Sequence, residues 1–332
     1  MTLRPVELLQ SLAPVSRPTI ALSEGSDPRV VAGALAAISA DIADIILVGP
    51  EADIQAELEA QSASDSSHLS IHDPATSDLT AGFAAAFFDL RKHKGVDEAK
   101  SQVAMLNPVT YAAMLVRLGH ATGTVGGAVN TTSDIVRAAI QVIGKAPDAA
   151  MVSSFFLMYP PSEDGRTMLY SDCGLVIDPS AQELASIAEA SAKSCQSLLR
   201  QEPKIAMLSF STKGSASHPA VAKVETATQA LRDNRPDLNV DGELQFDAAF
   251  VPSVGEKKSP GSQVAGLANV MIFPNLDAGN IGYKITQRLG GYAAIGPIMQ
   301  GLDKPANDLS RGCVAEDVTQ MIAVTALQAL AD

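Results

Sequence analysis

Hydrophobic runs and amphipathic segments alternate along the first part of the chain. The run at 17–25 predicts a buried strand, and Pro28 opens an alanine-rich helix, since proline is favoured in the first turn of a helix. A second strand is predicted at 43–50, a helix near 51–61 and a short strand at 67–73. This alternation predicts a parallel sheet with helices on its faces.

The rest of the chain repeats the alternation after a longer helical stretch. Its predicted elements are a helical region at 78–118, a glycine-rich strand and loop running into a helix at 121–144, strands within 149–160, 204–219 and 269–280, and helices at 181–200 and 315–331. The last helix contains neither proline nor glycine.

The length and composition indicate two domains. With 332 residues, 46% of them hydrophobic and 18% charged, the chain can bury a large core. We expect an α/β fold of two domains with parallel-type sheets flanked by helices. The first domain is predicted to span 1–146 plus 297–332 and the second 147–296, with a cleft between them.

Several function classes are disfavoured by composition. No apolar run approaches the roughly 20 residues that span a bilayer, and the first ten residues do not resemble a secretion signal, so we expect a cytoplasmic protein. Cys173, Cys195 and Cys313 are widely spaced and odd in number, which fits neither a disulfide framework nor a zinc site. The net charge of −13 disfavours nucleic acid, so any anion must be bound locally.

Two loops have the composition of an anion site. In the first, Thr131 and Thr132 open a helix after a glycine-rich strand, and Arg137 follows about one turn later. The spacing matches neither a dinucleotide-binding nor a Walker-type motif. In the second, Ser211, Thr212 and Lys213 precede a glycine. The alternatives are an ordinary helix cap in the first loop and a flexible surface loop in the second.

Other cations are candidate contacts for an anion. Arg29 follows a strand, at the end where ligands gather in open α/β sheets, although a solvated surface residue is an equal alternative. Arg91 lies in a basic segment at a glycine-terminated helix end, where cations also suit the helix dipole. Lys284 and Arg288 are four residues apart on one predicted helix face, where they repel each other unless an anion lies between them.

The segment 304–318 carries the groups needed for acid and base chemistry. Pro305, Asn307 and Asp308 favour a tight turn, after which Ser310, Arg311 and Asp317 provide a hydroxyl, a guanidinium and a carboxylate at the start of a helix. Taken one at a time, such residues are common as caps and ion pairs at helix ends. Together with the two loops, they indicate an active site.

Six segments in fixed order give the chain a nearly end-to-end resemblance to the phosphate acetyl/butyryltransferase family, within its short, single-unit phosphate acetyltransferase class. They are RKHKG (91–95), NTTSDIVRAAIQVI (130–143), AMLSFSTKGSA (206–216), DGELQFDAA (241–249), FPNLDAGNIGYKITQR (273–288) and GPIMQGLDKPANDLSRGC (296–313). Two positions depart from the family pattern: Asn130 stands where histidine is frequent, and Ala138 where proline is frequent.

The resemblance implies an enzyme that interconverts acetyl-CoA plus phosphate with acetyl phosphate plus CoA. It implies two α/β domains like those of isocitrate and isopropylmalate dehydrogenases, an active site in the cleft and a homodimer. CoA is then a substrate, with no permanently bound cofactor and no metal. By match to the family motifs, Ser310, Arg311 and Asp317 form the catalytic group, and Arg91 and Arg137 bind CoA or phosphate.

The chemistry suggests a direct transfer. A free thiol has a pKa near 8.5 and an ordinary aspartate one near 3.9, so complete proton transfer before attack would cost about 6 kcal/mol. We therefore expect Asp317 to take the proton of the CoA thiol as the thiol attacks, while Ser310 hydrogen-bonds the sulfur and Arg311 neutralises the phosphate. Because Ser310 has no histidine or lysine base beside it in sequence, a ternary complex is favoured over an acyl-enzyme.

Three alternatives remain open at this point. A butyryl or other short-acyl preference depends on pocket shape, which the sequence does not reveal. A non-catalytic regulatory domain would not need Ser310, Arg311 and Asp317 together. A dehydrogenase of similar architecture would need a nicotinamide site and clustered metal-binding aspartates, and Asp277, Asp303 and Asp308 do not show that spacing.

Overall fold

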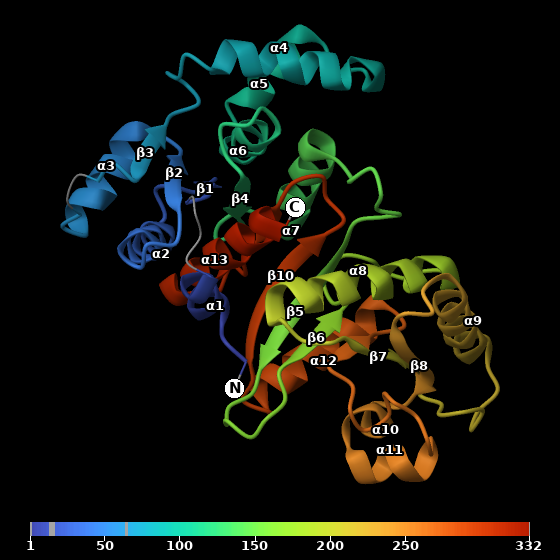
Figure 1. Cartoon of the computed structure of the whole chain (residues 1–332). Coiled ribbons are helices and arrows are strands. Elements are labelled where there is room, and N and C mark those ends of the chain that lie inside the picture. Colours follow the sequence, from blue (N-terminus) through green and yellow to red (C-terminus); the bar gives the residue numbers. More distant parts are fainter. Residues whose placement is uncertain (1, 13–16, 64–65, 332) are drawn as a thin grey trace. The chain divides into compact units, whose positions relative to one another are not determined.

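The structure is a computed structural model that describes residues 2–12, 17–63 and 66–331 (Figure 1). The chain forms two compact units, each of which is described by itself. We call Leu3–Pro147 with Leu302–Asp332 the terminal unit, and Asp148–Gly301 the central unit. Both consist of a sheet flanked by helices, so the predicted α/β class is confirmed.

The terminal unit contains a five-stranded sheet in the order β11-β4-β1-β2-β3, with all neighbouring strands parallel. Its strands are β1 (Thr19–Leu22), β2 (Asp44–Val48), β3 (Leu69–His72), β4 (Gly123–Gly126) and β11 (Ala306–Asp308). Strands β1, β2 and β4 are almost wholly buried, as expected for a parallel sheet covered on both faces. All five strands therefore end at the same edge of the sheet.

Most of the terminal unit's helices connect these strands. They are α1 (Pro5–Leu12), α2 (Pro28–Ser39), α3 (Glu51–Ala60), α4 (Thr80–Arg91), η1 (Lys92–Lys94), α5 (Glu98–Met105), α6 (Pro108–Arg117), α7 (Thr132–Ala138), the π-helical η2 (Ala139–Ile143) and α13 (Ala315–Ala331). Pro28 stands at the start of α2 as predicted, after Asp27, whose carboxylate caps the helix.

The C-terminal helix α13 packs closely on α2 and β4 because small residues face it. A Cβ on Gly33 would lie 2.6 Å from the Cβ of Val318, and one on Gly123 would lie 2.4 Å from the Cγ2 of Thr325. The fully buried Asn307 of β11 donates its side-chain amide to Thr325 Oγ1 at 2.9 Å. These contacts fix α13, and with it the segment that leads into it.

The central unit contains a six-stranded mixed sheet in the order β10-β5-β6-β9-β7-β8. Its strands are β5 (Ser153–Tyr159), β6 (Met168–Ser171), β7 (Lys204–Leu208), β8 (Asn239–Leu244), β9 (Val270–Ile272) and β10 (Ala293–Gln300). The β10-β5 and β5-β6 pairs are antiparallel and the other pairs are parallel. Its helices are α8 (Ala181–Leu199), α9 (Pro219–Asn234), α10 (Phe246–Phe250), α11 (Pro252–Lys258) and α12 (Leu276–Arg288).

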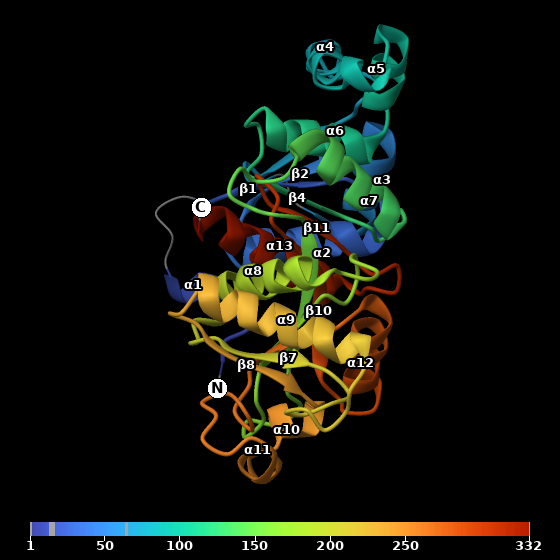
Figure 2. The ribbon, with the colours of Figure 1, turned by 90° about the vertical axis from the view of Figure 1, so that its right-hand side faces the viewer.

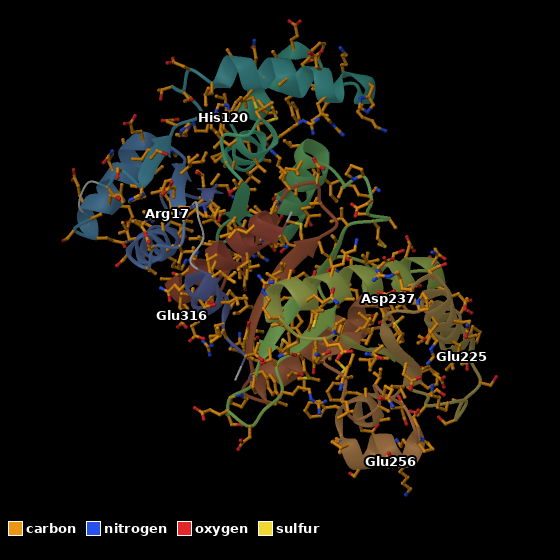
Figure 3. All side chains as sticks on the ribbon, viewed as in Figure 1. Arg17, His120, Glu225, Asp237, Glu256 and Glu316 are labelled. Carbon is orange, nitrogen blue, oxygen red and sulfur yellow. The ribbon has the colours of Figure 1, made fainter. Side chains whose placement is uncertain are left out.

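Helices α8 and α9 pack side by side along this sheet (Figure 2). The capping box of Ser180 and Glu183 starts α8, and Pro219 starts α9. A core cluster that includes Phe156, Tyr170 and Met271 fills the unit, and charged side chains such as Asp237 project outward (Figure 3).

Most predicted elements are confirmed, including the C-terminal helix over 315–331. The tight turn predicted from Pro305, Asn307 and Asp308 is wrong: residues 306–308 form β11. Turn residues were a poor guide because the polar side chain of Asn307 finds partners on α13 inside the core. Within the described ranges, no helix has both the length and the apolar character required to cross a bilayer.

Candidate active site

Three loops of the terminal unit meet at one edge of its sheet. They follow β1, β4 and β11, which are neighbours in the order β11-β4-β1 and all run parallel. Parallel neighbours bring their carboxyl ends together, and in open α/β sheets ligands bind at that edge. Segments near residues 24–29, 127–132 and 308–317 are thereby joined, although they are far apart in the sequence.

Glu24, at the end of β1, occupies the glycine-rich loop after β4. Its carboxylate is buried and accepts hydrogen bonds from the backbone N–H groups of Ala128 at 2.6 Å, Val129 at 3.0 Å and Asn130 at 2.7 Å. The side-chain amide of Asn130 donates a fourth, at 2.7 Å. The N–H groups of this loop therefore bind a carboxylate of the protein itself.

Arg29 holds the three loops together. Its guanidinium donates to both carboxylate oxygens of Asp27, at 2.9 and 2.8 Å, and to the carbonyl of Ala128 at 2.8 Å. It also donates to the carbonyls of Arg311 at 2.8 Å and Cys313 at 3.3 Å. The Arg29 hydrogen bond holds the pKa of Asp27 below its usual value. All N–H groups of the Arg29 guanidinium therefore donate to acceptors of the protein itself, so Arg29 could contact a ligand anion only by giving up some of these hydrogen bonds.

The loop after β11, which we call the Ser310 loop (309–314), presents its polar side chains to solvent. Ser310, Arg311 and Asp317 are all exposed. The Ser310 hydroxyl accepts from the backbone N–H of Gly312 at 3.3 Å, and the Asp317 carboxylate accepts from that of Val314 at 2.9 Å. The carboxylate therefore closes the first turn of α13 while it stays accessible.

Cys313 lies inside the Ser310 loop and is buried. Burial raises the pKa of its thiol; Arg29 opposes that rise, and the carboxylates of Asp317, Asp27 and Glu24 add to it. A thiol held in its protonated form is a poor nucleophile, which agrees with a packing role for Cys313.

Asp308, the last residue of β11, is a buried carboxyl beside the Ser310 loop. Its Oδ2 accepts from the hydroxyl of Thr132 at 2.6 Å, whereas its Oδ1 is buried without a hydrogen-bond partner among the described residues. Burial raises the pKa of Asp308 to about 7; the Thr132 hydrogen bond opposes that rise, the charge of Glu24 adds to it, and Arg311 opposes it.

The predicted residues of α7 have different surroundings. Thr131 caps the helix and donates its hydroxyl to the Asp134 carboxylate at 2.7 Å, and Thr132 holds Asp308. Arg137 is exposed and pairs with Asp134 at 2.9 Å. Of the three, only Thr132 is seen to contact a residue beside the Ser310 loop, namely Asp308. Arg137 lies about one turn further along α7.

Arg91 ends α4 in the same unit, as its basic segment predicts. Its Nε is buried without a hydrogen-bond partner among the described residues, whereas the neighbouring Lys92 pairs with Asp89 at 2.7 Å.

The second predicted anion loop lies in the central unit, after β7. The Ser211 hydroxyl donates to the Glu243 carboxylate at 2.8 Å, and the N–H of Gly214 donates to the same oxygen at 2.8 Å. Thr212 Oγ1 accepts from the N–H of Gln245 at 2.9 Å. Ser211 and Thr212 are buried, so here too a carboxylate of the protein occupies the loop.

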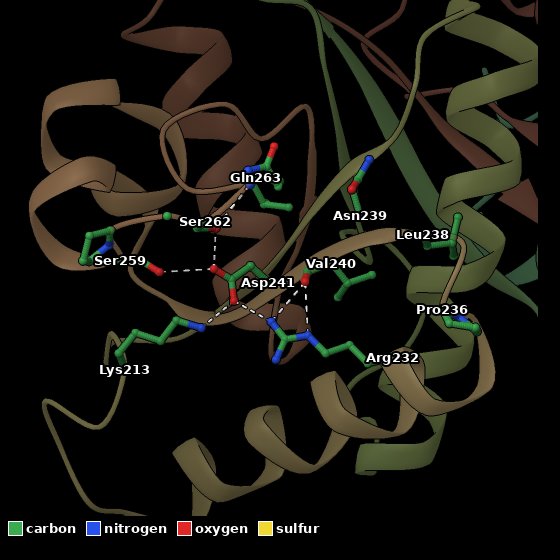
Figure 4. A pocket seen from close by; sticks show the side chains of 13 residues that line it. Lys213, Arg232, Pro236, Leu238, Asn239, Val240, Asp241, Ser259, Ser262 and Gln263 are labelled. Atoms are coloured by element: carbon green, nitrogen blue, oxygen red, sulfur yellow. Dashed lines mark hydrogen bonds and ion pairs between the residues drawn. The ribbon is translucent and has the colours of Figure 1, made fainter.

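Lys213 lies beside a pocket of about 590 Å³ at the edge of the same unit (Figure 4). Its ammonium contacts the buried carboxylate of Asp241, which also binds Arg232 at 2.7 Å and the hydroxyls of Ser259 at 3.2 Å and Ser262 at 2.5 Å. Two cations thus share one carboxylate on the pocket wall.

Lys284 and Arg288 are exposed on α12, also in the central unit. The Lys284 ammonium lies 5.2 Å from the ring centroid of Tyr283. The shared helix face predicted for the two cations follows from their spacing within one continuous helix.

Within residues 2–12, 17–63 and 66–331, no group of three or more His, Cys, Asp or Glu side chains is arranged to hold a metal ion.

Comparison with known proteins decides the family. A profile described as phosphate acetyl/butaryl transferase matches residues 6–326. The chain belongs to this family. It is 46% identical over 331 residues to a phosphate acetyltransferase of Thermoanaerobacterium thermosaccharolyticum, covering 98% of this chain and 100% of the relative. It is 44% identical to one of Paracoccus denitrificans, covering 98% and 99%.

Solved structures agree with this membership of the phosphate acetyl/butaryl transferase family. A phosphotransacetylase from Streptococcus pyogenes superposes with a TM-score of 0.92 at 40% identity, covering 99% of this chain and 98% of that one. A putative 4-hydroxythreonine-4-phosphate dehydrogenase from Salmonella typhimurium, at 12% identity, has a TM-score of 0.59 over 94% and 99% of the two chains. That likeness shows a shared fold and nothing about activity.

Two residues of the candidate site were not singled out in the sequence. Glu24 lay at the end of the run 17–25 that predicts a strand, and Asp308 lay in the predicted turn. For Glu24, a carboxylate just after a predicted buried strand of an α/β sheet is a usable signal, because the carboxyl end of such a strand lies at the ligand-binding edge. Asp308 gave no such signal, since no strand was predicted before it. Their partners could not be read from the sequence, since Glu24 and Asn130 are joined only by strand order.

Proposed function

We propose that the chain transfers an acetyl group reversibly between CoA and phosphate: acetyl-CoA plus phosphate gives acetyl phosphate plus CoA. The observation that carries the proposal is the accessible Ser310 and Arg311 on the Ser310 loop, followed by the accessible Asp317 in the first turn of α13, at the carboxyl edge of a parallel sheet. This arrangement occurs in a chain that matches phosphate acetyltransferases along its whole length.

The proposed transfer occurs in a ternary complex. Asp317 takes the proton of the CoA thiol as the sulfur forms its bond to the acetyl carbon of acetyl phosphate, and the bond from that carbon to the phosphate oxygen breaks. Arg311 offsets the charge of the phosphoryl group and of the carbonyl oxygen, and the Ser310 hydroxyl hydrogen-bonds the sulfur. The buried Cys313, whose pKa is raised, is not needed in this scheme.

The remaining predicted contacts belong to the same proposal. Arg91 and Arg137 are proposed to bind anionic groups of CoA or phosphate, which their match to the family motifs supports. Lys284 and Arg288 are exposed cations that suit further phosphate groups. CoA is proposed as a substrate without a permanently bound cofactor, in a cytoplasmic homodimer.

An acetyl group is favoured over larger acyl groups. The chain shares 41% identity with the EutD phosphotransacetylase from Staphylococcus aureus, but only 20% with a branched-chain phosphotransacylase from Enterococcus faecalis. A phosphate butyryltransferase remains the second candidate, because the family profile covers both activities.

The test is phosphate-dependent release of CoA from acetyl-CoA by the purified protein, without added metal or nicotinamide. Free thiol should appear in proportion to phosphate, and butyryl-CoA should be a poorer substrate. Thiol release that does not depend on phosphate would indicate a hydrolase and contradict the proposal. No release from either thioester would favour a non-catalytic regulatory role.

A further inference from the structure

Two valines are exposed in the loops that follow β4 and β11. Val129 is 60% exposed and Val314 is 58% exposed, although both side chains are apolar. The other exposed large apolar side chains in the described part of the terminal unit lie in or beside α1, α5 and α6, in η2 and at the end of α13, none of them in a loop that follows a strand: Leu3, Leu12, Val103, Leu106, Leu118, Ile140 and Leu330. Single exposed apolar residues are ordinary, so the position of these two valines is what distinguishes them.

One guanidinium group brings the two valines together. Arg29 donates to the carbonyl of Ala128 at 2.8 Å and to the carbonyl of Cys313 at 3.3 Å. These carbonyls belong to the residues directly before Val129 and Val314, so the two backbone segments are neighbours in space. Ala128 and Cys313 are buried, whereas the valine after each of them is exposed. At both points the chain therefore buries one small side chain and presents the next, apolar one to solvent.

The backbone N–H groups of both valines are also fixed. The N–H of Val129 donates to the Glu24 carboxylate at 3.0 Å, and that of Val314 donates to the Asp317 carboxylate at 2.9 Å. Hydrogen bonds thus hold each valine from both sides, and a contact that is already ordered costs little conformational entropy on binding. The second of these bonds places the apolar pair next to the accessible carboxylate of Asp317.

We propose that Val129 and Val314 bind the pantetheine arm of CoA close to its thiol. The inference rests on the proposed function, which brings the thiol to Asp317. Phosphate and the phosphoryl group of acetyl phosphate are polar and gain nothing from an apolar surface. The methylene groups of the pantetheine arm do gain, because their contact with the valines removes apolar surface from water. The pair then holds the end of the arm while Asp317 takes the thiol proton.

The experiment is a calorimetric titration of CoA into the wild type, Val129→Thr, Val314→Thr and the double variant. Threonine keeps the shape of valine and replaces one methyl group by a hydroxyl, so it removes apolar contact without opening space. We expect the Kd for CoA to rise about fourfold in each single variant and about 15-fold in the double variant, the value of one methyl-sized group at each position. Free CoA carries no acyl group, so the titration reports on the pantetheine arm.

Val103→Thr is the matched control, because Val103 is a 69% exposed valine on α5 of the same unit. Its Kd for CoA should equal that of the wild type. An unchanged Kd in the double variant, or an equal rise in Val103→Thr, would overturn the proposal.

Two further readouts separate an apolar contact from a general disturbance of the loops. Burial of apolar surface makes the heat-capacity change of binding negative, so titrations at several temperatures should give a less negative value for the double variant than for the wild type. The Michaelis constant for acetyl phosphate should stay the same. A constant for acetyl phosphate that rises as much as the Kd for CoA would contradict the proposal.

Failure of the proposed function gives a different result from failure of this inference. If the wild type transfers no acetyl group between CoA and phosphate, the proposed function is wrong. If the wild type is active and the valine variants bind CoA as it does, only the role of Val129 and Val314 is wrong.

Discussion

The glycine-containing loops at 126–132 and 211–214 share a composition but differ in their surroundings. Each encloses a carboxylate of the protein, Glu24 in the terminal unit and Glu243 in the central unit. Beside the first lie the exposed loop with Ser310 and Arg311 and the buried carboxyl of Asp308, whose Oδ1 has no hydrogen-bond partner among the described residues. Beside the second, Lys213 shares Asp241 with Arg232.

The difference shows that an anion-binding loop need not bind a substrate. Backbone N–H groups that point into a loop must be satisfied in any folded state, and an internal carboxylate can do this as well as a phosphate. What distinguishes the terminal unit is accessible chemistry next to the filled loop. We therefore expect changes around the first loop to lower enzymatic activity, and changes around the second loop to lower only the stability of the fold.

The largest effect is expected for Asp317→Asn. Removing the proposed base should lower turnover by at least about 100-fold with modest change in either Michaelis constant. Steady-state kinetics in the direction of acetyl phosphate formation measures it. Glu316→Gln is the control, because Glu316 is the exposed neighbour whose partner is Arg4 (Figure 3). Near-normal turnover in Asp317→Asn would remove Asp317 from the role of base.

Arg311→Gln should weaken the use of phosphate as a substrate and also lower turnover. The loss of the guanidinium should lower kcat/KM for phosphate by about 100-fold, the usual cost of one charge-stabilising donor. Its carbonyl, which accepts from Arg29, is unaffected by the change. An unchanged response to phosphate concentration would show that the phosphate binds elsewhere.

Asp308→Asn should change the pH dependence of stability. Because the pKa of Asp308 is raised from 3.8 to about 7, the folded state binds more protons than the unfolded state between these values, and this group makes stability fall as pH rises. Asparagine does not ionise, so the variant lacks this decrease. The unfolding free energy of the variant minus that of the wild type should therefore rise by about 3 kcal/mol from about pH 5 to about pH 8. Urea unfolding at both pH values measures the difference. A gap between the proteins that is independent of pH would contradict the raised pKa.

Arg29→Lys should loosen all three loops of the terminal unit. Lysine cannot reproduce the fork that binds Asp27 and three carbonyls, so we expect about 2 kcal/mol lower unfolding free energy and reduced turnover. Arg4→Lys is the control, since Arg4 makes one exposed ion pair. Full activity in Arg29→Lys, measured alongside thermal unfolding, would show that the loops do not need this connection.

The smallest effect is expected for Lys213→Met in the central unit. Asp241 would keep Arg232, Ser259 and Ser262, so the unfolding free energy should fall by about 1 kcal/mol. Both Michaelis constants should stay as in the wild type. A rise in the constant for CoA would instead support Lys213 as the substrate contact that its sequence context predicts, and would remove the contrast between the two loops.

Local patterns predicted much of the fold. Hydrophobic periodicity, Pro28 and the uninterrupted helix over 315–331 are short-range features, and short-range physics decides them. The same holds for Ser310, Arg311 and Asp317, which stand within eight residues of one another and needed no tertiary contact to be grouped.

The tertiary structure alone decided which groups face one another. Strand order placed Glu24 inside the loop that contains Asn130, turned Arg29 from a candidate anion contact into the connection between three loops, and buried Asp308 against Gly127. These partners lie tens to hundreds of residues apart. Burial and the charge of a distant neighbour set the protonation of Asp308, and neither is written in the residues next to it.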